Sequence, residues 1–161
     1  MQRREVLTGL SAAVAAAVWP LRAHAHHGWS SFDQTRPLYL EGVARQVRWR
    51  NPHAEFTLEL APNLALPADL TQRAMPAQTA RVDAAAVLAN TRLPTRRDPR
   101  WAIELAPLTR INQWRIPEIA DGTPVAVIGF TFTGEQGDAL LRAEYLFLNG
   151  QVYGLRSSPA N

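Results

Sequence analysis

Histidine is the residue type in this chain that is best suited to metal chemistry, and its four copies are unevenly placed. Three of them, His24, His26 and His27, lie within four consecutive positions, and His53 follows an Asn-Pro pair. Imidazole nitrogens bind Cu2+, Zn2+ and other divalent ions. The placement suggests a metal site that joins the start of the chain to His53.

The first 25 residues have the layout of a cleavable export signal. Arg3 and Arg4 precede an apolar stretch, residues 6–21, which is followed by small residues. The stretch is interrupted by polar residues and is shorter than the ~20 residues of a bilayer span, so we expect no stable membrane anchor. The paired arginines favour a twin-arginine signal over a general secretory signal, and either one leads to the periplasm or to secretion.

Cleavage after Ala25 fits the small residues of the Ala-His-Ala pattern that ends the signal. The cut discards His24 and makes His26 the amino-terminal residue of the mature chain, with His27 beside it. Residues 1–25 are then the signal peptide, and residues 26–161 are expected to form a single domain.

An amino-terminal histidine can hold a metal ion through its free amine and its ring nitrogen. A third nitrogen, from His53 or His27, completes the planar set that Cu2+ favours. Asp33 is expected as an axial oxygen ligand or as the acceptor that orients a histidine ring. Zn2+ is the alternative ion, bound by His26, His27 and His53 with a water molecule. Neighbouring histidines on an extended segment point to opposite sides, so a purely structural role for these residues stays open.

Composition excludes several other chemistries. The chain has no cysteine, which rules out disulfides, thiolate metal ligands and a cysteine nucleophile. Met75 is the one methionine beyond the signal, too few for a thioether Cu+ site. Lysine is absent and the arginines are dispersed, so a nucleic-acid partner is not expected. Neither a nucleophile elbow nor a glycine-rich phosphate loop occurs, and an enzyme is not indicated.

Alternation of apolar and polar residues predicts β-strands. Residues 54–60 follow the two-residue period of a half-buried strand. In residues 37–49 the alternation changes phase, and we expect a β-bulge at Gly42. The same change in residues 123–133 predicts a bulge at Gly129. Two bulged strands indicate the strong curvature of a small barrel.

Further strands are predicted from Trp101, from Ala139 and from Gln151, and a short helix is predicted between Pro107 and Pro117. The fold is therefore expected to be all-β with one short helix. A helix between the third and fourth of five strands indicates a small OB-like β-barrel. An open sandwich is the alternative.

Residues 62–100 form a long excursion between the second and third strands, with a predicted strand at 79–83 and a predicted short helix at 84–90. Its arginines could grip an anionic partner, and the aromatic residues of the chain could line a ligand groove. A solvated loop and core packing are the alternatives. The arginines are Arg92, Arg96, Arg97 and Arg100, and the aromatic residues are Trp29, Phe32, Trp49, Trp101 and Trp114.

Two segments, HHGWSSFD at residues 26–33 and VRWRNPHAEFTLEL at residues 47–60, resemble a family of small exported bacterial proteins of uncharacterised function. The resemblance implies that the histidines and Asn51 belong to one recurring arrangement, with Asn51 and Trp49 beside the metal ligands. It implies no reaction. The positions that carry it are His26, His27, Phe32, Asp33, Trp49, Asn51, Pro52 and His53.

Two functional hypotheses follow. The first is a periplasmic protein that binds a divalent ion, Cu2+ before Zn2+, through His26, His27 and His53. The second is a non-catalytic accessory module that binds a protein partner or a small ligand through its aromatic face and long loop. An oxidative copper enzyme is a more remote third, because a set of metal ligands alone does not make a substrate site.

Overall fold

The computed structural model describes residues 28–160. The predicted signal, the cut after Ala25 and the three histidines His24, His26 and His27 lie outside this range. Six strands, two α-helices and three short 3-10 helices follow one another in the described range. The elements are η1 (Trp29–Ser31), β1 (Leu38–Arg48), β2 (Glu55–Leu60), η2 (Leu70–Gln72), α1 (Ala84–Asn90), β3 (Arg100–Glu104), α2 (Leu108–Gln113), β4 (Pro124–Phe130), η3 (Thr133–Glu135), β5 (Leu140–Leu148) and β6 (Gln151–Gly154).

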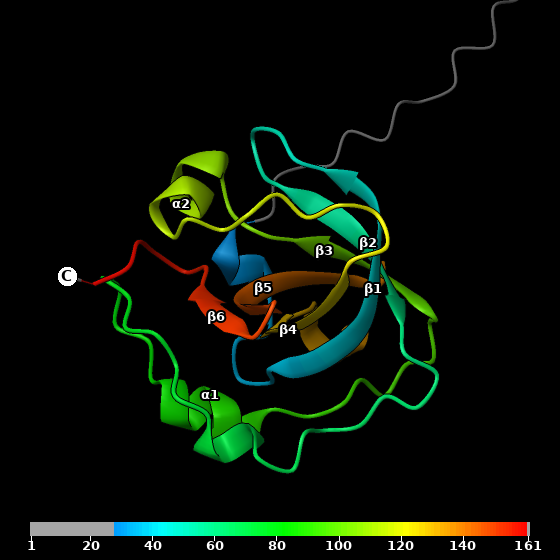
Figure 1. Cartoon of the computed structure of the whole chain (residues 1–161). Coiled ribbons are helices and arrows are strands. Elements are labelled where there is room, and N and C mark those ends of the chain that lie inside the picture. Colours follow the sequence, from blue (N-terminus) through cyan, green and yellow to red (C-terminus); the bar gives the residue numbers. More distant parts are fainter. Residues whose placement is uncertain (1–27, 161) are drawn as a thin grey trace, which may run out of the picture.

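Five of the strands close into a barrel (Figure 1). Antiparallel pairings join β3 to β2, β2 to β1, β1 to β4 and β4 to β5, and a parallel pairing between β3 and β5 completes the circle. β6 lies outside the circle, antiparallel to β5. With α2 between β3 and β4, this order confirms the predicted OB-like barrel.

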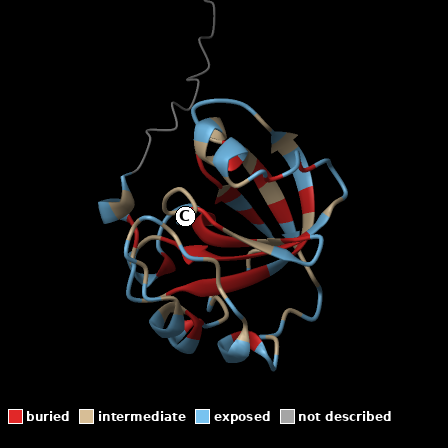
Figure 2. Ribbon diagram, turned by 60° about the vertical axis from the view of Figure 1, so that its left-hand side comes forward, coloured by how far each residue is buried: buried red, intermediate tan, exposed pale blue. Residues whose placement is uncertain are grey.

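The barrel interior is filled by the apolar residues that alternate along each strand. Leu58, Trp101 and Ile103 are fully buried there, and the buried strands stand out against the exposed loops in Figure 2. Ile111 of α2 belongs to the same core and is fully buried. The predicted short helix thus packs its apolar side onto the barrel core.

The first bulge lies further along β1 than predicted. Gly42 pairs in regular register with Leu60 of β2 and with Val125 of β4, and the register shift falls between Arg45 and Arg48. The prediction of a bulge at Gly42 was therefore wrong. A Cβ at Gly42 would lie 1.9 Å from the Glu59 carbonyl oxygen, so a close approach of β2 requires this glycine.

An acceptor distant in sequence holds the bulge in β1. The backbone N–H groups of Gln46 and Val47 donate to the Asp121 carboxylate at 3.0 and 2.9 Å, and Gln46 has a φ of 51°. These two bonds hold the pKa of Asp121 below its ordinary value. The bulge returns Val47 and Trp49 to the core side of the strand.

The second register shift lies beside Gly129, where a bulge was predicted in β4, but the bulged strand is its partner β5. Ile128 pairs with Tyr145 and Gly129 pairs with Ala143, which leaves Glu144 as the extra residue of β5. Glu144 is fully buried. Its carboxylate accepts hydrogen bonds from Arg156 Nε at 2.7 Å and from the Gln78 side chain at 3.2 Å.

The excursion between β2 and β3 covers the outer face of β1, β4 and β5, and runs along the lower side of the view in Figure 1. A second apolar cluster forms beneath it, in which Leu70 and Leu88 pack on Tyr39, Ile128 and Tyr145.

The predicted helix in the excursion is confirmed as α1, which starts after Asp83, whose side chain accepts the Ala86 N–H. The predicted strand at 79–83 was wrong. That stretch is coil next to an isolated bridge between Gln78 and Pro159.

Within residues 28–160, none of the helices combines the length and the apolar character that crossing a membrane requires.

Candidate functional site

Four charged side chains form a continuous row across the outer face of the barrel. Strand register places Arg48 opposite Glu55, Glu55 opposite Glu104, and Glu104 opposite Arg142. The row continues to Phe130 of β4. Because residues in register on neighbouring strands share a face of the sheet, all five lie on the outside. We call the four charged residues the charge row.

Each acid of the charge row is paired with the arginine beside it. Arg48 Nη1 lies 2.9 Å from Glu55 Oε1, and both side chains are substantially exposed. Arg142 Nη2 lies 2.6 Å from Glu104 Oε2, with exposed side-chain fractions of only 8% and 12%. The second pair is therefore the more strongly desolvated and the more costly to break.

His53 lies at one end of the charge row, in the turn between β1 and β2. Ala54, its neighbour, is fully buried and donates its N–H to the Ala106 carbonyl, which extends the pairing of β2 with the chain after β3. His53 itself is half-buried and lines a cavity of about 460 Å³, which we call the histidine cavity. Its lining consists of Arg48, Arg50, Asn51, Pro52, His53, Glu55 and Glu104.

These positions agree with the expectation that His53 shares a side with Glu55, away from the core. His53, Asn51 and both acids of the charge row line the histidine cavity. Among residues 28–160, no three histidine or acidic side chains lie close enough together to hold a metal ion.

The segment that follows the predicted amino-terminal histidines packs on the other end of the charge row. The Arg142 guanidinium carbon lies 5.5 Å from the Trp29 ring centroid and 4.9 Å from that of Phe32. Arg156 stacks more closely on Trp29, at 3.7 Å. Phe130 meets the Trp29 ring edge-on at 6.3 Å. Trp29 thus rests on the arginine that holds Glu104.

Asp33 lies apart from the histidine cavity. Its carboxylate oxygen Oδ1 accepts the Thr35 N–H at 3.0 Å and the Thr35 hydroxyl at 2.6 Å, and its own N–H donates to the Thr131 carbonyl. It lines a separate small cavity with Glu135. These bonds form a turn that directs the chain from η1 into β1. A metal role for Asp33 stays a prediction.

The remaining predicted residues are distributed between the core and the loops. Trp101 is fully buried, and Trp49 and Trp114 pack partly buried against the core, as the core-packing alternative proposed. In the excursion, Arg96 binds Asp98 and the carbonyls of Glu135 and Gly137. Its guanidinium is therefore already bound to groups of the protein itself.

Sequence reasoning missed Glu55, Glu104 and Arg142 as site residues. One signal was available, because Arg142 and Glu144 are charged residues in a largely apolar strand, and a charge in such a strand needs a partner. For Arg142, the identity of that partner depends on the parallel register of β3 and β5.

Comparison with known proteins concerns the first part of the chain. Residues 13–67 match a family described as a family of unknown function (DUF6152), and the matched stretch includes β1, β2 and the turn that carries His53. No curated protein and no solved structure matches the chain. Over residues 13–67 the chain is thus similar to DUF6152, a family of unknown function.

Proposed function

We propose that the protein binds a divalent metal ion, Cu2+ with Zn2+ as the alternative, at the histidine cavity after export to the periplasm. His53 supplies one imidazole from the barrel. His26 and His27 supply the remaining nitrogens from the mature amino terminus, His26 through both its amine and its ring. The role is binding or transfer of the ion.

The observation that carries this proposal is the packing of Trp29 on Arg142. Arg142 binds Glu104, and Glu104 lines the same cavity as His53. Arg142 and Glu55 lie two strands apart, which corresponds to about 10 Å. His26 lies three positions before Trp29, and three residue steps of extended chain span up to about 10 Å. This packing anchors the segment that follows His26 and His27 on the same face of the barrel as the charge row, whose other end adjoins the histidine cavity.

The surroundings of the cavity suit a cation. Glu55 and Glu104 contribute two carboxylates, each already paired with an arginine. We assign them to the outer environment of the ion, where they would orient ligand rings or accept a hydrogen bond from bound water. Asn51 at the rim would serve in the same way.

A titration of the exported protein with Cu2+ tests the proposal. Intact mass first establishes that the mature chain begins at His26. Calorimetry then measures the affinity, and electron paramagnetic resonance reports nitrogen ligation. His53→Gln is expected to weaken Cu2+ binding by at least about tenfold, because one of three nitrogens is lost. A chain with one glycine added before His26 is expected to show a similar loss, since its free amine is displaced.

Arg50→Gln is the matched control, because Arg50 lines the same cavity and cannot act as a ligand. It should retain the affinity of the unchanged protein. Equal affinity of the unchanged protein and His53→Gln would contradict the proposal, as would a mature chain that starts at another residue.

A further inference from the structure

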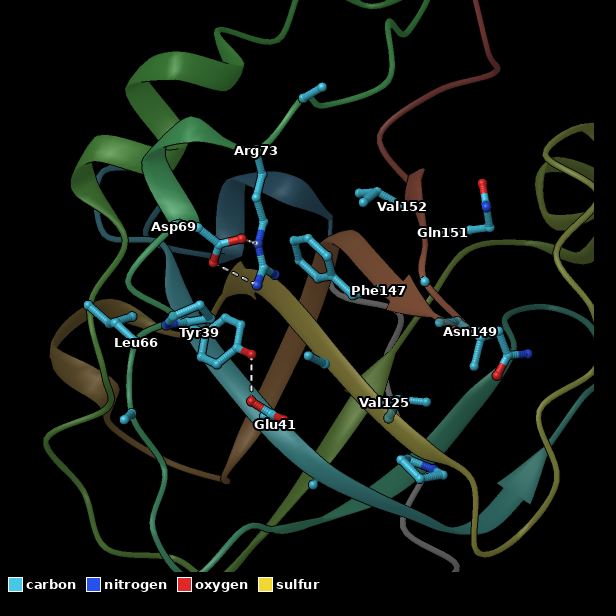
Figure 3. Close-up of a pocket in the computed structure, with 18 residues that line it drawn as sticks. Tyr39, Glu41, Leu66, Asp69, Arg73, Val125, Phe147, Asn149, Gln151 and Val152 are labelled. Carbon is cyan, nitrogen blue, oxygen red and sulfur yellow. Dashed lines mark hydrogen bonds and ion pairs between the residues drawn. The ribbon is translucent and has the colours of Figure 1, made fainter.

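A larger cavity lies on a different face from the histidine cavity. Its volume is about 820 Å³, within the range of small-molecule sites. The excursion forms one wall, and the outer faces of β1, β4, β5 and β6 form the floor (Figure 3). We call it the excursion cavity.

Strand register explains why the floor is hollow. Glu41 of β1 pairs with Ala126 of β4, Ala126 pairs with Phe147 of β5, and Phe147 pairs with Val152 of β6. The small Ala126 side chain leaves a gap between the Glu41 carboxylate and the Phe147 ring. Two strand spacings, about 10 Å, separate these two residues. The gap is wide enough for one ring or a short alkyl chain.

The wall adds apolar surface to this gap. Leu66, 39% exposed, lines the excursion cavity, and it is the one exposed large hydrophobic side chain among residues 28–160. Proline residues 67 and 124 and Val125 line the cavity as well. Small-molecule pockets combine apolar lining of this kind with a few polar groups.

The charged groups of the cavity leave one negative charge in excess. Its lining contains two carboxylates, Glu41 and Asp69, and one guanidinium, Arg73. Arg73 is committed to Asp69 through two hydrogen bonds of 3.1 and 3.0 Å, which Figure 3 shows as dashed lines. Its guanidinium also lies 5.3 Å from the Phe147 ring centroid. Glu41 is therefore the carboxylate without an arginine partner in this cavity.

Tyr39 orients that carboxylate. Its hydroxyl donates to Glu41 Oε2 at 2.6 Å. Burial, and then this bond to a carboxylate, raise the pKa of Tyr39 above its ordinary value, so the phenol stays a neutral donor. The Glu41 carboxylate is thus held in place at one side of the apolar gap.

We propose that the excursion cavity binds a small organic cation with an aromatic or apolar body, of the arylalkylamine class. The ammonium group pairs with Glu41, and the body of the ligand fills the gap over Ala126 against Phe147 and Leu66. This site is independent of the metal site, and it gives the ligand-binding alternative suggested by the long loop a defined location and ligand chemistry.

Titration of the 15N-labelled protein with three ligands of similar size tests the proposal, in the presence of a chelator so that metal plays no part. The ligands are benzylammonium, benzyl alcohol and benzoate. We expect amide shifts centred on Ala126 and Phe147, and tighter binding of benzylammonium than of the other two by about tenfold or more, the usual gain from a charge-assisted contact. Binding of none of them at millimolar concentration, or equal binding of all three, overturns the proposal.

Two substitutions locate the ligand. Glu41→Gln keeps the acceptor for Tyr39 and removes the charge, so it should weaken benzylammonium binding by about tenfold and leave benzyl alcohol unaffected. Glu118→Gln, at an exposed carboxylate outside the cavity lining, is the matched control. Leu66→Ser should weaken both ligands without disturbing the core. Unchanged benzylammonium affinity in Glu41→Gln would overturn the assignment.

Discussion

Glu55 and Glu104 face one another across the pairing of β2 with β3, and each carboxylate is held by an arginine from the strand on its other side. Like charges directly opposite one another destabilise a sheet. Arg48 and Arg142 offset that repulsion, and the row is therefore a single unit of four charges. Its stability depends most on the desolvated end, at Arg142.

Replacing Arg142 by Met should destabilise the protein by about 3 kcal/mol, because it leaves the Glu104 carboxylate without its partner in a largely buried position. The double variant with Glu104→Gln should recover a substantial part of the loss. Urea denaturation of the two single variants and the double variant measures the coupling, which we expect at about 1–3 kcal/mol. Simple additivity of the two single effects would show that the pair is not coupled.

Protonation of Glu135 should lower the free energy of unfolding in acid. Burial raises the pKa of this carboxyl, but hydrogen bonds from the Arg96 and Thr95 N–H groups and the charge of Arg36 outweigh burial, so the folded-state pKa lies below its ordinary value of 4.5. A group with a lowered folded-state pKa stabilises the fold above the unfolded pKa, and this contribution is lost as pH falls through the folded value.

The free energy of unfolding should therefore decrease between pH 5 and pH 3, and Glu135→Gln should make that decrease shallower. Urea denaturation at several pH values checks this, with Glu118→Gln as the comparison. The same slope in Glu135→Gln and in the unchanged protein would remove Glu135 as the cause.

Substitutions at Gly42 and Gly150 compare the stability cost of a steric clash with the cost of backbone strain. A Cβ at Gly42 meets the Glu59 carbonyl oxygen at 1.9 Å, so Gly42→Ala should cost about 3 kcal/mol or more. Gly150 has open space around it but a φ of +76°, so Gly150→Ala should cost only about 1 kcal/mol. Chemical denaturation ranks the two. Equal costs would mean that β1 and β2 can separate at Gly42 more easily than their register indicates.

Trp29→Ala tests whether the docked segment positions the proposed metal ligands. The change removes the ring on which Arg156 and Arg142 stack, and it should weaken Cu2+ binding by about tenfold through loss of preorganisation. Trp29→Phe keeps an aromatic face and should retain most of the affinity. Calorimetric titration gives the affinities, and a denaturation curve shows that both variants fold. Unchanged affinity in Trp29→Ala would separate the segment from the metal site.

Local pattern was sufficient to predict the six strands of the sheet, the two short α-helices and the barrel, although it also predicted a strand at 79–83 that does not form. Alternation in residues 54–60 predicts β2 within one residue, and the apolar spacing after Pro107 predicts α2. The first bulge was misplaced, because its position depends on Asp121, an acceptor 75 residues from Gln46. The second register shift was predicted at the correct place, because Gly129 itself adjoins it, but it was assigned to β4 although the extra residue, Glu144, belongs to β5.

The outer surface was harder to predict. Every residue of β5 except Phe147 is buried, and such a strand must be covered on both faces. The excursion supplies part of that cover, whereas the sequence analysis had treated it only as a long loop. The charge row and the excursion cavity depend on side chains brought together by the register of four strands, which no local period encodes. His53 was predicted with the correct orientation because a single strand determines it.

The contact of Arg156 with Trp29 ties the last residues of the described chain to the first. Arg156 also neutralises Glu144 inside the second bulge. Removing the chain from residue 156 onward would therefore expose the Trp29 indole and, at the same time, leave the buried Glu144 carboxylate without its arginine partner. Arg156, near the end of the described residues, therefore holds Trp29, near their start, in place. Truncation at the C-terminal end would loosen the packing at the N-terminal end.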